Sequence, residues 1–506
     1  MLQIIADIRT RAVELLRPTV ASLGYALFLA VNATGVWGGV FPFLPDSIQT
    51  ADIMFWFYLA LSLALLAVFV IAARLPYGLT RMRPFYQVVG AGVVYFAGWA
   101  CLIAAMYLRP YAFPASVAGG VLLGAGSGLF YLLWQRLFAS RDDDAGLRDM
   151  VVGFAYASLF YFALYALPRA VVAYLIPLVA LPLFALALIL ANRTIDFSQP
   201  MFADPPDEHR RVYRRAFASL WRSALSMGAI ALCTGSTRAW AIDGPAVGSL
   251  VNLLSMGALL CAAVTVLALW RYKGLKLNII KLYRFVFPVL ITAFALLPLA
   301  SERYARVLAA ILYALYSLGL LLTMLSCAQM SRDRGINPFF AFGTFGGIVY
   351  GLHDAGFILG TLLHRVSVPA VGNGALLAIT AIYLLALMFF IGSVNFKNSA
   401  PQLLMGDTIE LMAPVEARPS VAPAVPAAPA QGAASYEESL ARLQERYHLS
   451  DREIEVVDLV ARGLTVPRIA SDLYISENTV RTHKKRIYAK LDVHKKQELT
   501  DLLASL

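Results

Sequence analysis

The feature that most constrains this chain is a series of long apolar runs. Twelve stretches lie between residues 20 and 394, each close to the 18–25 residues that cross a hydrocarbon core. They are 20–41, 53–72, 88–108, 112–134, 150–167, 170–191, 224–242, 247–270, 282–300, 305–327, 339–363 and 370–394. Backbone polar groups must be satisfied inside a bilayer, so each run is predicted to form a helix. Hydrophobic residues make up 59% of the chain and charged residues 14%, which excludes a wholly soluble enzyme.

Basic residues give an independent test of this topology. With the N-terminus in the cytoplasm, alternate loops place 22 Lys and Arg residues inside and five outside. The 192–223 connection alone carries six arginines on the inside. This asymmetry follows the positive-inside rule. It predicts a multi-pass protein of the cell inner (cytoplasmic) membrane, embedded in the lipid bilayer with both termini cytoplasmic.

The 192–223 connection also divides the bundle into two sets of six helices. This 6+6 arrangement, over residues of about 20–395, resembles the major facilitator superfamily, whose two halves surround a midplane site. Loop 74–83 has a glycine and basic residues where that superfamily has its signature loop. The acidic residue of the signature is absent, so the resemblance to a working transporter is incomplete.

The composition changes after residue 397. Residues 398–435 are rich in Ala and Pro, with six prolines and no helical periodicity, and are predicted to form a semi-extended linker. Residues 436–506 are soluble in character and hold 24 charges. We therefore expect a membrane bundle over 1–397, a linker over 398–435 and a soluble domain over 436–506.

The soluble domain carries the local signals of a helix-turn-helix. Ser450 and Glu453 have the spacing of a capping box at the start of a helix. A short second helix follows, and a turn at 474–476 leads to a third helix over about 477–491. Two helices joined by a tight turn, the second of them basic, are typical of this motif. Segment 481–496 has seven basic residues against one acid, which suits duplex phosphates, although a solvated face that binds nothing fits the charge equally well.

A family resemblance favours the first interpretation. The run Leu449-Ser450-Asp451-Arg452-Glu453-Ile454-Glu455-Val456 resembles the opening of the LuxR-type DNA-binding domain. Further matches at that family's spacing are Gly463, Ile469, Ala470, Leu473, Ile475, Ser476, Thr479, Val480, Arg481, His483, Ile487, Lys490, Leu491 and Val493. The resemblance spans about 60 residues and implies a four-helix domain whose third helix enters the major groove.

The same resemblance implies roles for individual residues. The base-facing residues would be Arg481, Thr482 and Lys485, and those near phosphates Thr479, Lys484 and Lys490. A fourth helix over about 494–505 would pair two copies on a two-fold DNA site through Leu499, Leu502 and Leu503. The implied partners are double-stranded promoter DNA and a second copy of the chain, with RNA polymerase as a further candidate.

Polar residues inside the apolar runs are the other candidates, because ionisable groups at membrane depth are costly. They are Asn32, Arg238, His353 and Asp354. One interpretation is a pair that only locks helices together. The other is a polar pocket for a small-molecule ligand or a proton, with Asp354 as its anion.

The sequence thus predicts an all-α protein, a twelve-helix membrane bundle joined to a four-helix DNA-binding domain. The favoured function is a bacterial, membrane-bound one-component transcription regulator that senses a small molecule or a membrane state. The alternative is a solute transporter with an appended DNA-binding tail. The four cysteines lie in apolar runs without a C-x-x-C pair, and no nucleophile–base or metal cluster emerges. We therefore expect no catalytic site, no metal and no cofactor.

Overall fold

The computed structural model describes most of the chain. The described residues are 17–33, 50–80, 82–141, 143–197, 199–203, 210–241, 245–273, 275–299, 302–365, 373–394, 408–411, 433–447, 449–461, 469–470, 473, 477–493 and 496–504. They form two compact units, Met1–Val415 and Glu416–Leu506, and the division falls inside the predicted linker. Each unit is described by itself.

The first half of the membrane unit contains the helices of the first six predicted spans. They are α2 (Val20–Val31), α3 (Ala51–Arg74), α5 (Pro84–Tyr107), α6 (Ala112–Ser140), α7 (Asp143–Tyr165) and the continuous series α8 (Arg169–Leu175), η3 (Ile176–Ala180) and α9 (Leu181–Asn192). Short helices α4 (Pro76–Thr80), η2 (Arg109–Tyr111) and α10 (Pro200–Ala203) lie in the connections. The residues at their N-termini explain where several of these helices begin. Thr19 and Ser22 form a capping box on α2, Thr50 caps α3, and Pro84 is the first residue of α5.

The second half has the same number of predicted spans. Its helices are α11 (Arg210–Ala241), α12 (Pro245–Lys273), α13 (Ile279–Leu296), continued by η4 (Leu297–Leu299), α14 (Glu302–Arg334), α15 (Pro338–Arg365) and α16 (Asn373–Val394). Two short strands, β1 (Leu275–Asn278) and β2 (Thr408–Leu411), pair antiparallel. Gly335 follows α14 with a φ of 65°, a conformation that glycine adopts without strain, and so turns the chain into α15.

Each of the twelve predicted apolar runs falls on helix in the described residues. Among the described residues, seven helical segments are long and apolar enough to cross a membrane, and four shorter apolar helices accompany them. The all-α membrane architecture is therefore confirmed, apart from the single strand pair, while the exact count of twelve spans stays a prediction.

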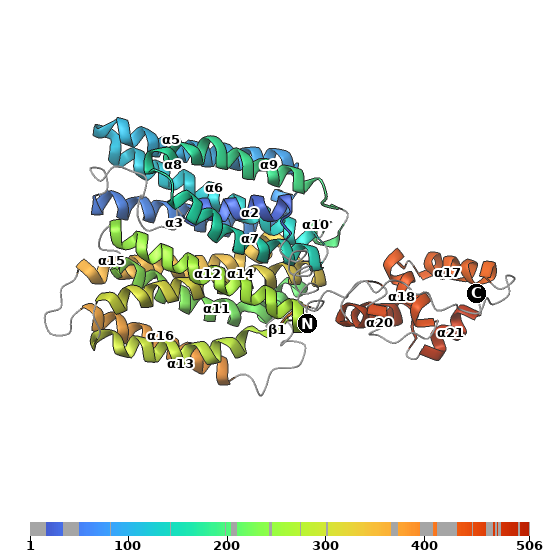
Figure 1. The fold of residues 1–506 in the computed structure, drawn as a ribbon. Helices are drawn as coiled ribbons and strands as arrows, with labels where there is room; N and C mark the ends of the chain where they lie inside the picture. Colours follow the sequence, from blue (N-terminus) through green and yellow to red (C-terminus); the bar gives the residue numbers. More distant parts are fainter. Residues whose placement is uncertain are drawn as a thin grey trace, which may run out of the picture. The chain divides into compact units, whose positions relative to one another are not determined.

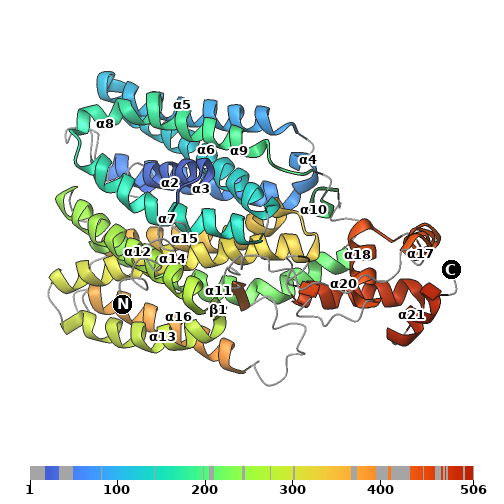
Figure 2. The same ribbon diagram turned by 45° about the vertical axis from the view of Figure 1, so that its right-hand side comes forward.

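The two halves pack side by side (Figures 1 and 2). In Figure 1, α5, α8 and α9 form one edge and α13 and α16 the other, with α7, α12, α14 and α15 between them. Contacts between the halves run through α3 with α15, α7 with α12, and α6 with α14. The α3–α15 contact is close: a Cβ on Gly343 would lie 2.8 Å from the Phe69 carbonyl oxygen. Farther along the same pair, the rings of Tyr58 and Phe357 meet at 5.6 Å.

Polar contacts join the halves at the end where α6 finishes and α15 begins. Asn337 Nδ2 donates to Thr80 Oγ1 of α4 at 2.8 Å. Arg332 Nη1 donates to the Arg141 carbonyl at 2.7 Å. The bond between the uncharged Asn337 and Thr80 side chains is worth about 1 kcal/mol net, and the bond from the charged Arg332 guanidinium about 1.5–3 kcal/mol, so together they hold the two halves together at this end.

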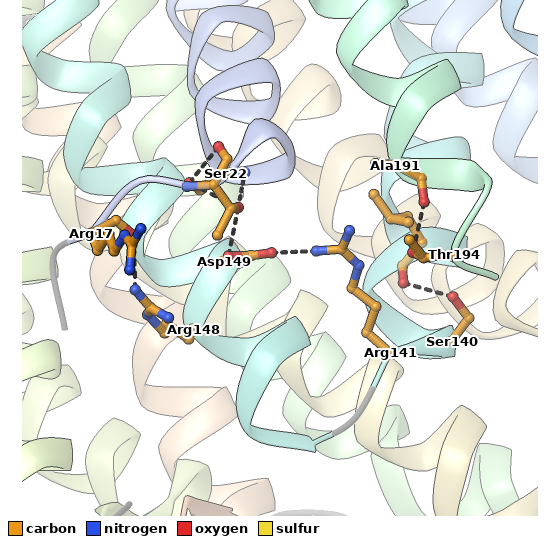
Figure 3. A network of polar contacts seen from close by, with 10 residues as sticks. Arg17, Ser22, Ser140, Arg141, Arg148, Asp149, Ala191 and Thr194 are labelled. Atoms are coloured by element: carbon orange, nitrogen blue, oxygen red, sulfur yellow. Dashed lines mark hydrogen bonds and ion pairs between the residues drawn. The ribbon is translucent and has the colours of Figure 1, made fainter. Parts of the chain in front are cut away.

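The same end of the first half is tied together by Asp149 at the start of α7 (Figure 3). Its carboxylate accepts a bond from Thr19 Oγ1 at 2.8 Å and pairs with Arg141. Arg148 Nη2 donates to the Arg17 carbonyl at 2.8 Å. These contacts fasten the N-terminal end of α2 to the α6–α7 connection.

The C-terminal unit is a small helical domain with its own core. Its helices are α17 (Ala433–Tyr447), α18 (Asp451–Ala461), α20 (Glu477–Leu491) and α21 (Lys496–Ala504), and residues 469–470 are also helical. The core residues are Leu443, Leu449, Val456, Val457, Val460, Ile469, Ala470, Val480, Ile487, Leu491, Val493, Leu499 and Leu503. The predicted third helix has the bounds of α20, and α17 begins within the predicted linker.

Candidate DNA-binding surface and membrane pocket

Helix α20 is the candidate recognition helix, and its apolar stripe fixes which face is exposed. Val480 and Ile487, seven residues apart, are buried in the domain core as predicted, and Leu491 extends the stripe. By helical spacing, Arg481, Thr482 and Lys485 fall on the other side of α20. Their side chains lie outside the described residues, so their role in reading bases stays a prediction.

The helix ends with a defined turn. Asp492 has a φ of 53°, in the left-handed region, and the Val493 amide donates to the Tyr488 carbonyl at 3.0 Å. This bond pattern terminates helices by satisfying a carbonyl of the last turn. It brings Val493 into the core and starts the chain toward α21.

The capping box predicted at Ser450 is present and has a second function. The Ser450 amide donates to Glu453 Oε2 at 3.0 Å, and the Glu453 amide donates to Ser450 Oγ at 3.3 Å. The same Glu453 carboxylate accepts a bond from Lys490 Nζ at 2.6 Å. Glu453 therefore joins the start of α18 to the last turn of α20.

The ion pair sets the protonation of Glu453. Burial raises the pKa of its carboxyl, but the bonds from Lys490 and Ser450 outweigh burial and leave the pKa below its usual value. Arg452 strengthens the same region, because its Nη2 donates to the Leu473 carbonyl beside the predicted turn. Helix α18 thus holds both parts of the helix-turn-helix.

Two predicted phosphate contacts have internal partners as well. Lys490 is bonded to Glu453, and its side chain is 42% exposed. The Lys484 ammonium lies 5.2 Å from the centroid of the Tyr488 ring, one turn along α20. Thr479 is half-buried near the start of the helix. The phosphate role of all three residues stays a prediction.

Helix α21 carries the predicted pairing residues, and its leucines face inward. Leu499 is fully buried and Leu503 is 4% exposed, both inside the domain core. Leu502 is half-buried against that core. Leu499 and Leu503 therefore anchor α21 to its own domain, and pairing through this helix, which stays a prediction, would have to use its outer side.

The predicted membrane pocket is divided between the two halves. Asn32 is buried on α2, where its Nδ2 donates to the Phe28 carbonyl at 2.9 Å and its Oδ1 accepts from Ser127 Oγ at 2.9 Å. His353 and Asp354 are on α15, with His353 Nδ1 3.2 Å from Asp354 Oδ1. Arg238 lies on α11, and its side chain is outside the described residues. The described contacts bring His353 and Asp354 together but not Asn32.

The His353 ring is half-buried against an aromatic neighbour. It stacks on Tyr316 of α14, with ring centroids 4.7 Å apart. Its Nε2 is buried and has no hydrogen-bond partner among the described residues. With Nδ1–H donated to Asp354, a neutral imidazole keeps a lone pair on Nε2 that can accept a proton or a donor group.

The backbone around this pair is tightly packed. A Cβ on Gly235 of α11 would lie 2.2 Å from the His353 carbonyl oxygen, and one on Gly356 would lie 2.1 Å from the Leu232 carbonyl. Ser236 Oγ donates to the Gly356 carbonyl at 2.9 Å. The α11–α15 contact is therefore a seam of small residues that holds the His353–Asp354 pair against α11.

Arg136 of α6 is a buried polar group, although its position after an apolar run predicts a cytoplasmic loop charge. Its side chain is fully buried, and Nη1 donates to Gln87 Oε1 of α5. The guanidinium lies 5.6 Å from the Phe339 ring centroid and 5.8 Å from that of Phe197. The only sequence signal was an arginine directly at the end of an apolar run.

Comparison with known proteins identifies the C-terminal unit. The family described as "Bacterial regulatory proteins, luxR family" matches residues 447–503, so the chain carries a luxR-type helix-turn-helix domain. A probable transcriptional regulatory protein NarL from Mycobacterium tuberculosis (strain ATCC 25618 / H37Rv) is 49% identical over 45 residues, 9% of this chain and 21% of the relative. The oxygen regulatory protein NreC of Staphylococcus haemolyticus is 43% identical over 53 residues, 10% of this chain and 24% of the relative. The chain thus spans about a quarter or less of these relatives.

The membrane unit is similar in fold to two solved transporter structures. FucP, a Major Facilitator Superfamily transporter in the outward conformation, superposes with a TM-score of 0.51 at 11% identity, over 75% of this chain and 98% of FucP. A bacterial homologue of the iron transporter ferroportin, in the outward-facing state, gives 0.51 at 15% identity, over 74% and 98%. At these identities the likeness shows the fold alone.

Proposed function

We propose that this protein is a membrane-bound one-component transcription regulator whose bundle senses a signal and whose tail binds promoter DNA. The observation that carries the proposal is one chain that holds both a luxR-type domain and a bundle of major-facilitator fold. A DNA-binding domain functions only in the cytoplasm, so we place both termini there and the bundle in the cytoplasmic membrane. A homodimer on a two-fold site is part of the proposal.

The sensing part of the proposal rests on His353 and Asp354. A half-buried imidazole, whose buried Nε2 has no partner among the described residues and which is held by a carboxylate and an aromatic ring, suits a proton or a ligand with a hydrogen-bond donor. The pair sits where α15 meets α11, and α15 also packs on α3 of the other half. A signal bound at this pair therefore acts on α15, a helix of the second half that also contacts the first half.

One experiment tests the whole proposal. The full chain in lipid nanodiscs is offered a randomised pool of duplex DNA, and bound sequences are read at several salt concentrations. We expect enrichment of a two-fold symmetric motif and a steep loss of affinity with salt. A chain that binds DNA without sequence preference contradicts the regulator function.

The fold favours a second candidate, a solute transporter with a DNA-binding regulatory tail. Its support is the likeness to FucP and to the ferroportin homologue, both transporters by description. Uptake into vesicles by a variant that lacks residues 433–506 separates the two functions. Substrate-specific flux that a matched Asp354→Asn variant abolishes supports the transporter, and flux equal to empty vesicles supports the regulator.

A further inference from the structure

Arg136, in the last turns of α6, is a buried charge that its described neighbours satisfy only in part. Its side chain is fully buried, and Nη1 donates to Gln87 Oε1 of α5. Nε and Nη2 are buried as well, and neither has a hydrogen-bond partner among the described residues. A buried charge is costly unless it is paired, and the amide of Gln87 is neutral. The described part of the chain therefore leaves this guanidinium without a counter-ion.

The two nitrogens without a partner form one donor edge. In the planar guanidinium, Nε–H and one N–H of Nη2 point in the same direction, whereas Nη1 lies away from that edge and is used by Gln87. Two parallel donors match two oxygens carried on one atom, as in a carboxylate or a phosphate group. The edge is therefore suited to bidentate recognition of an oxyanion.

The surroundings of the guanidinium come from both halves of the membrane unit. Its central carbon lies 5.6 Å from the ring centroid of Phe339 of α15. It lies 5.8 Å from the ring centroid of Phe197, in the connection between α9 and α10. Phe197 is 39% exposed, so on this side the guanidinium lies one side chain below the surface. A small solute thus has a short path to the donor edge.

The other described charges at this end favour an anion. Arg332 of α14 donates to the carbonyl of Arg141, five residues after Arg136. Asp149 is paired with Arg141 (Figure 3), and Asp196, in the connection after α9, is exposed to solvent. Among these five residues the positive charges outnumber the negative ones, and the two carboxylates do not occupy the donor edge of Arg136. The local potential is therefore positive.

We propose that Arg136 is an oxyanion-binding site between the two halves, with Nε and Nη2 as bidentate donors to a carboxylate or phosphate group. The site is separate from the His353–Asp354 pair and does not depend on the proposed regulator function. Since the guanidinium lies among α5, α6 and α15, a bound anion stabilises the arrangement in which these helices meet. The anion is a solute or a lipid headgroup, and the chemistry of recognition is the same for both.

Thermal unfolding of the full chain in nanodiscs tests the site, with inorganic phosphate as the probe. In phosphatidylcholine nanodiscs, we expect saturating phosphate to raise the unfolding temperature by about 2–4 °C over sodium chloride of equal ionic strength. Arg136→Gln removes the donor edge and should abolish this shift. Arg193→Gln, which changes an exposed arginine, is the matched control and should keep it. Equal shifts in all three chains would overturn the proposal.

A lipid arm identifies the source of the anion. Phosphatidic acid is added to the nanodiscs in a buffer without phosphate. A shift with this lipid but not with soluble phosphate assigns the anion to a headgroup, and the reverse result assigns it to a solute. A parent chain that responds to neither probe would overturn the proposal.

The stability without phosphate shows whether the chain supplies its own counter-ion. In phosphatidylcholine nanodiscs, Arg136→Gln should unfold at the temperature of the parent or above it, because a buried charge without a counter-ion is removed. A loss of more than about 4 °C would mean that a carboxylate of the chain pairs with Arg136, and would overturn the proposal. Gln87→Glu sets a carboxylate beside Nη1 and should also abolish the phosphate shift. A full shift in Gln87→Glu would count against the site.

Discussion

Glu453 of α18 and Lys490 of α20 are joined by a 2.6 Å bond between Oε2 and Nζ, across 37 residues of sequence. Glu453 is 5% exposed, whereas the Lys490 side chain is 42% exposed. The carboxylate depends on the pair more than the ammonium does, because only the carboxylate has been removed from water. Lys490 therefore stabilises the position of α20 in addition to any contact with phosphate.

The first prediction follows from this asymmetry. Lys490→Ala should lower the free energy of unfolding of the 433–506 domain by about 1 kcal/mol, the low end for an acceptor left without its partner, since the lysine is partly solvated. In a Glu453→Gln background the same substitution should cost less than half as much. Urea unfolding of the four variants measures this coupling. Equal losses in both backgrounds would show that the pair contributes nothing to the position of α20.

The second prediction concerns His483, which is half-buried on α20. Burial and then the nearby Arg486 charge lower the pKa of its imidazole below the usual value. Between that lowered pKa and the unfolded value of about 6.5, the unfolded chain binds more protons, so stability should rise with pH. Above about pH 6.5 this contribution should be constant.

The measurement is urea unfolding of the same domain from pH 5 to pH 8. His483→Gln should remove the rise in stability with pH that lies below about pH 6.5, and should leave the neutral plateau within about 1 kcal/mol. Glu453 titrates below its usual pKa and so acts in a lower pH window. An unchanged slope in His483→Gln would assign the pH dependence to another group.

Sequence patterns predicted the elements whose signals are local. The Ser450 and Glu453 capping box and the Val480–Ile487 stripe depend only on spacing along one helix, and both are present. The apolar runs follow from solvation by lipid alone, and each is helical where the structure describes it. The luxR-type domain was recognisable because its whole pattern lies within about 60 residues without a gap.

Features that join distant segments were not predictable. The Lys490 ammonium and the Arg136 guanidinium look like solvated charges in sequence, and only packing gives them Glu453 and Gln87 as partners. Leu499 and Leu503 could have faced a second copy or their own core, and periodicity does not distinguish the two. Strand β2 has four residues, too few for a period, and its partner lies more than a hundred residues away.

The third prediction concerns base reading by α20. Arg481→Ala should flatten the preference among operator sequences, because a guanidinium can donate to O6 and N7 of guanine, worth about 1–3 kcal/mol of discrimination. Lys484→Ala is the matched control on the same helix and should weaken all sequences alike, with the salt slope reduced by about one unit. Selection from a random DNA pool measures both. A motif unchanged by Arg481→Ala would mean that this helix reads bases by other residues.

The last prediction separates sensing from helix locking at Asp354. Asparagine keeps the shape of the side chain and an oxygen that can accept from His353 Nδ1, but it removes the negative charge. If the pair only locks α15 in place, Asp354→Asn should regulate a promoter reporter as the parent chain does. If the carboxylate is the anion of a pocket, the response to external pH or to a ligand found by thermal shift should fall at least tenfold.

Thermal unfolding of the Asp354→Asn variant in nanodiscs should change little in either case. Thr380→Ala, which removes a side-chain bond within α16, is the control and should leave the response intact. A full response in Asp354→Asn would exclude the pocket and leave the helix-locking interpretation.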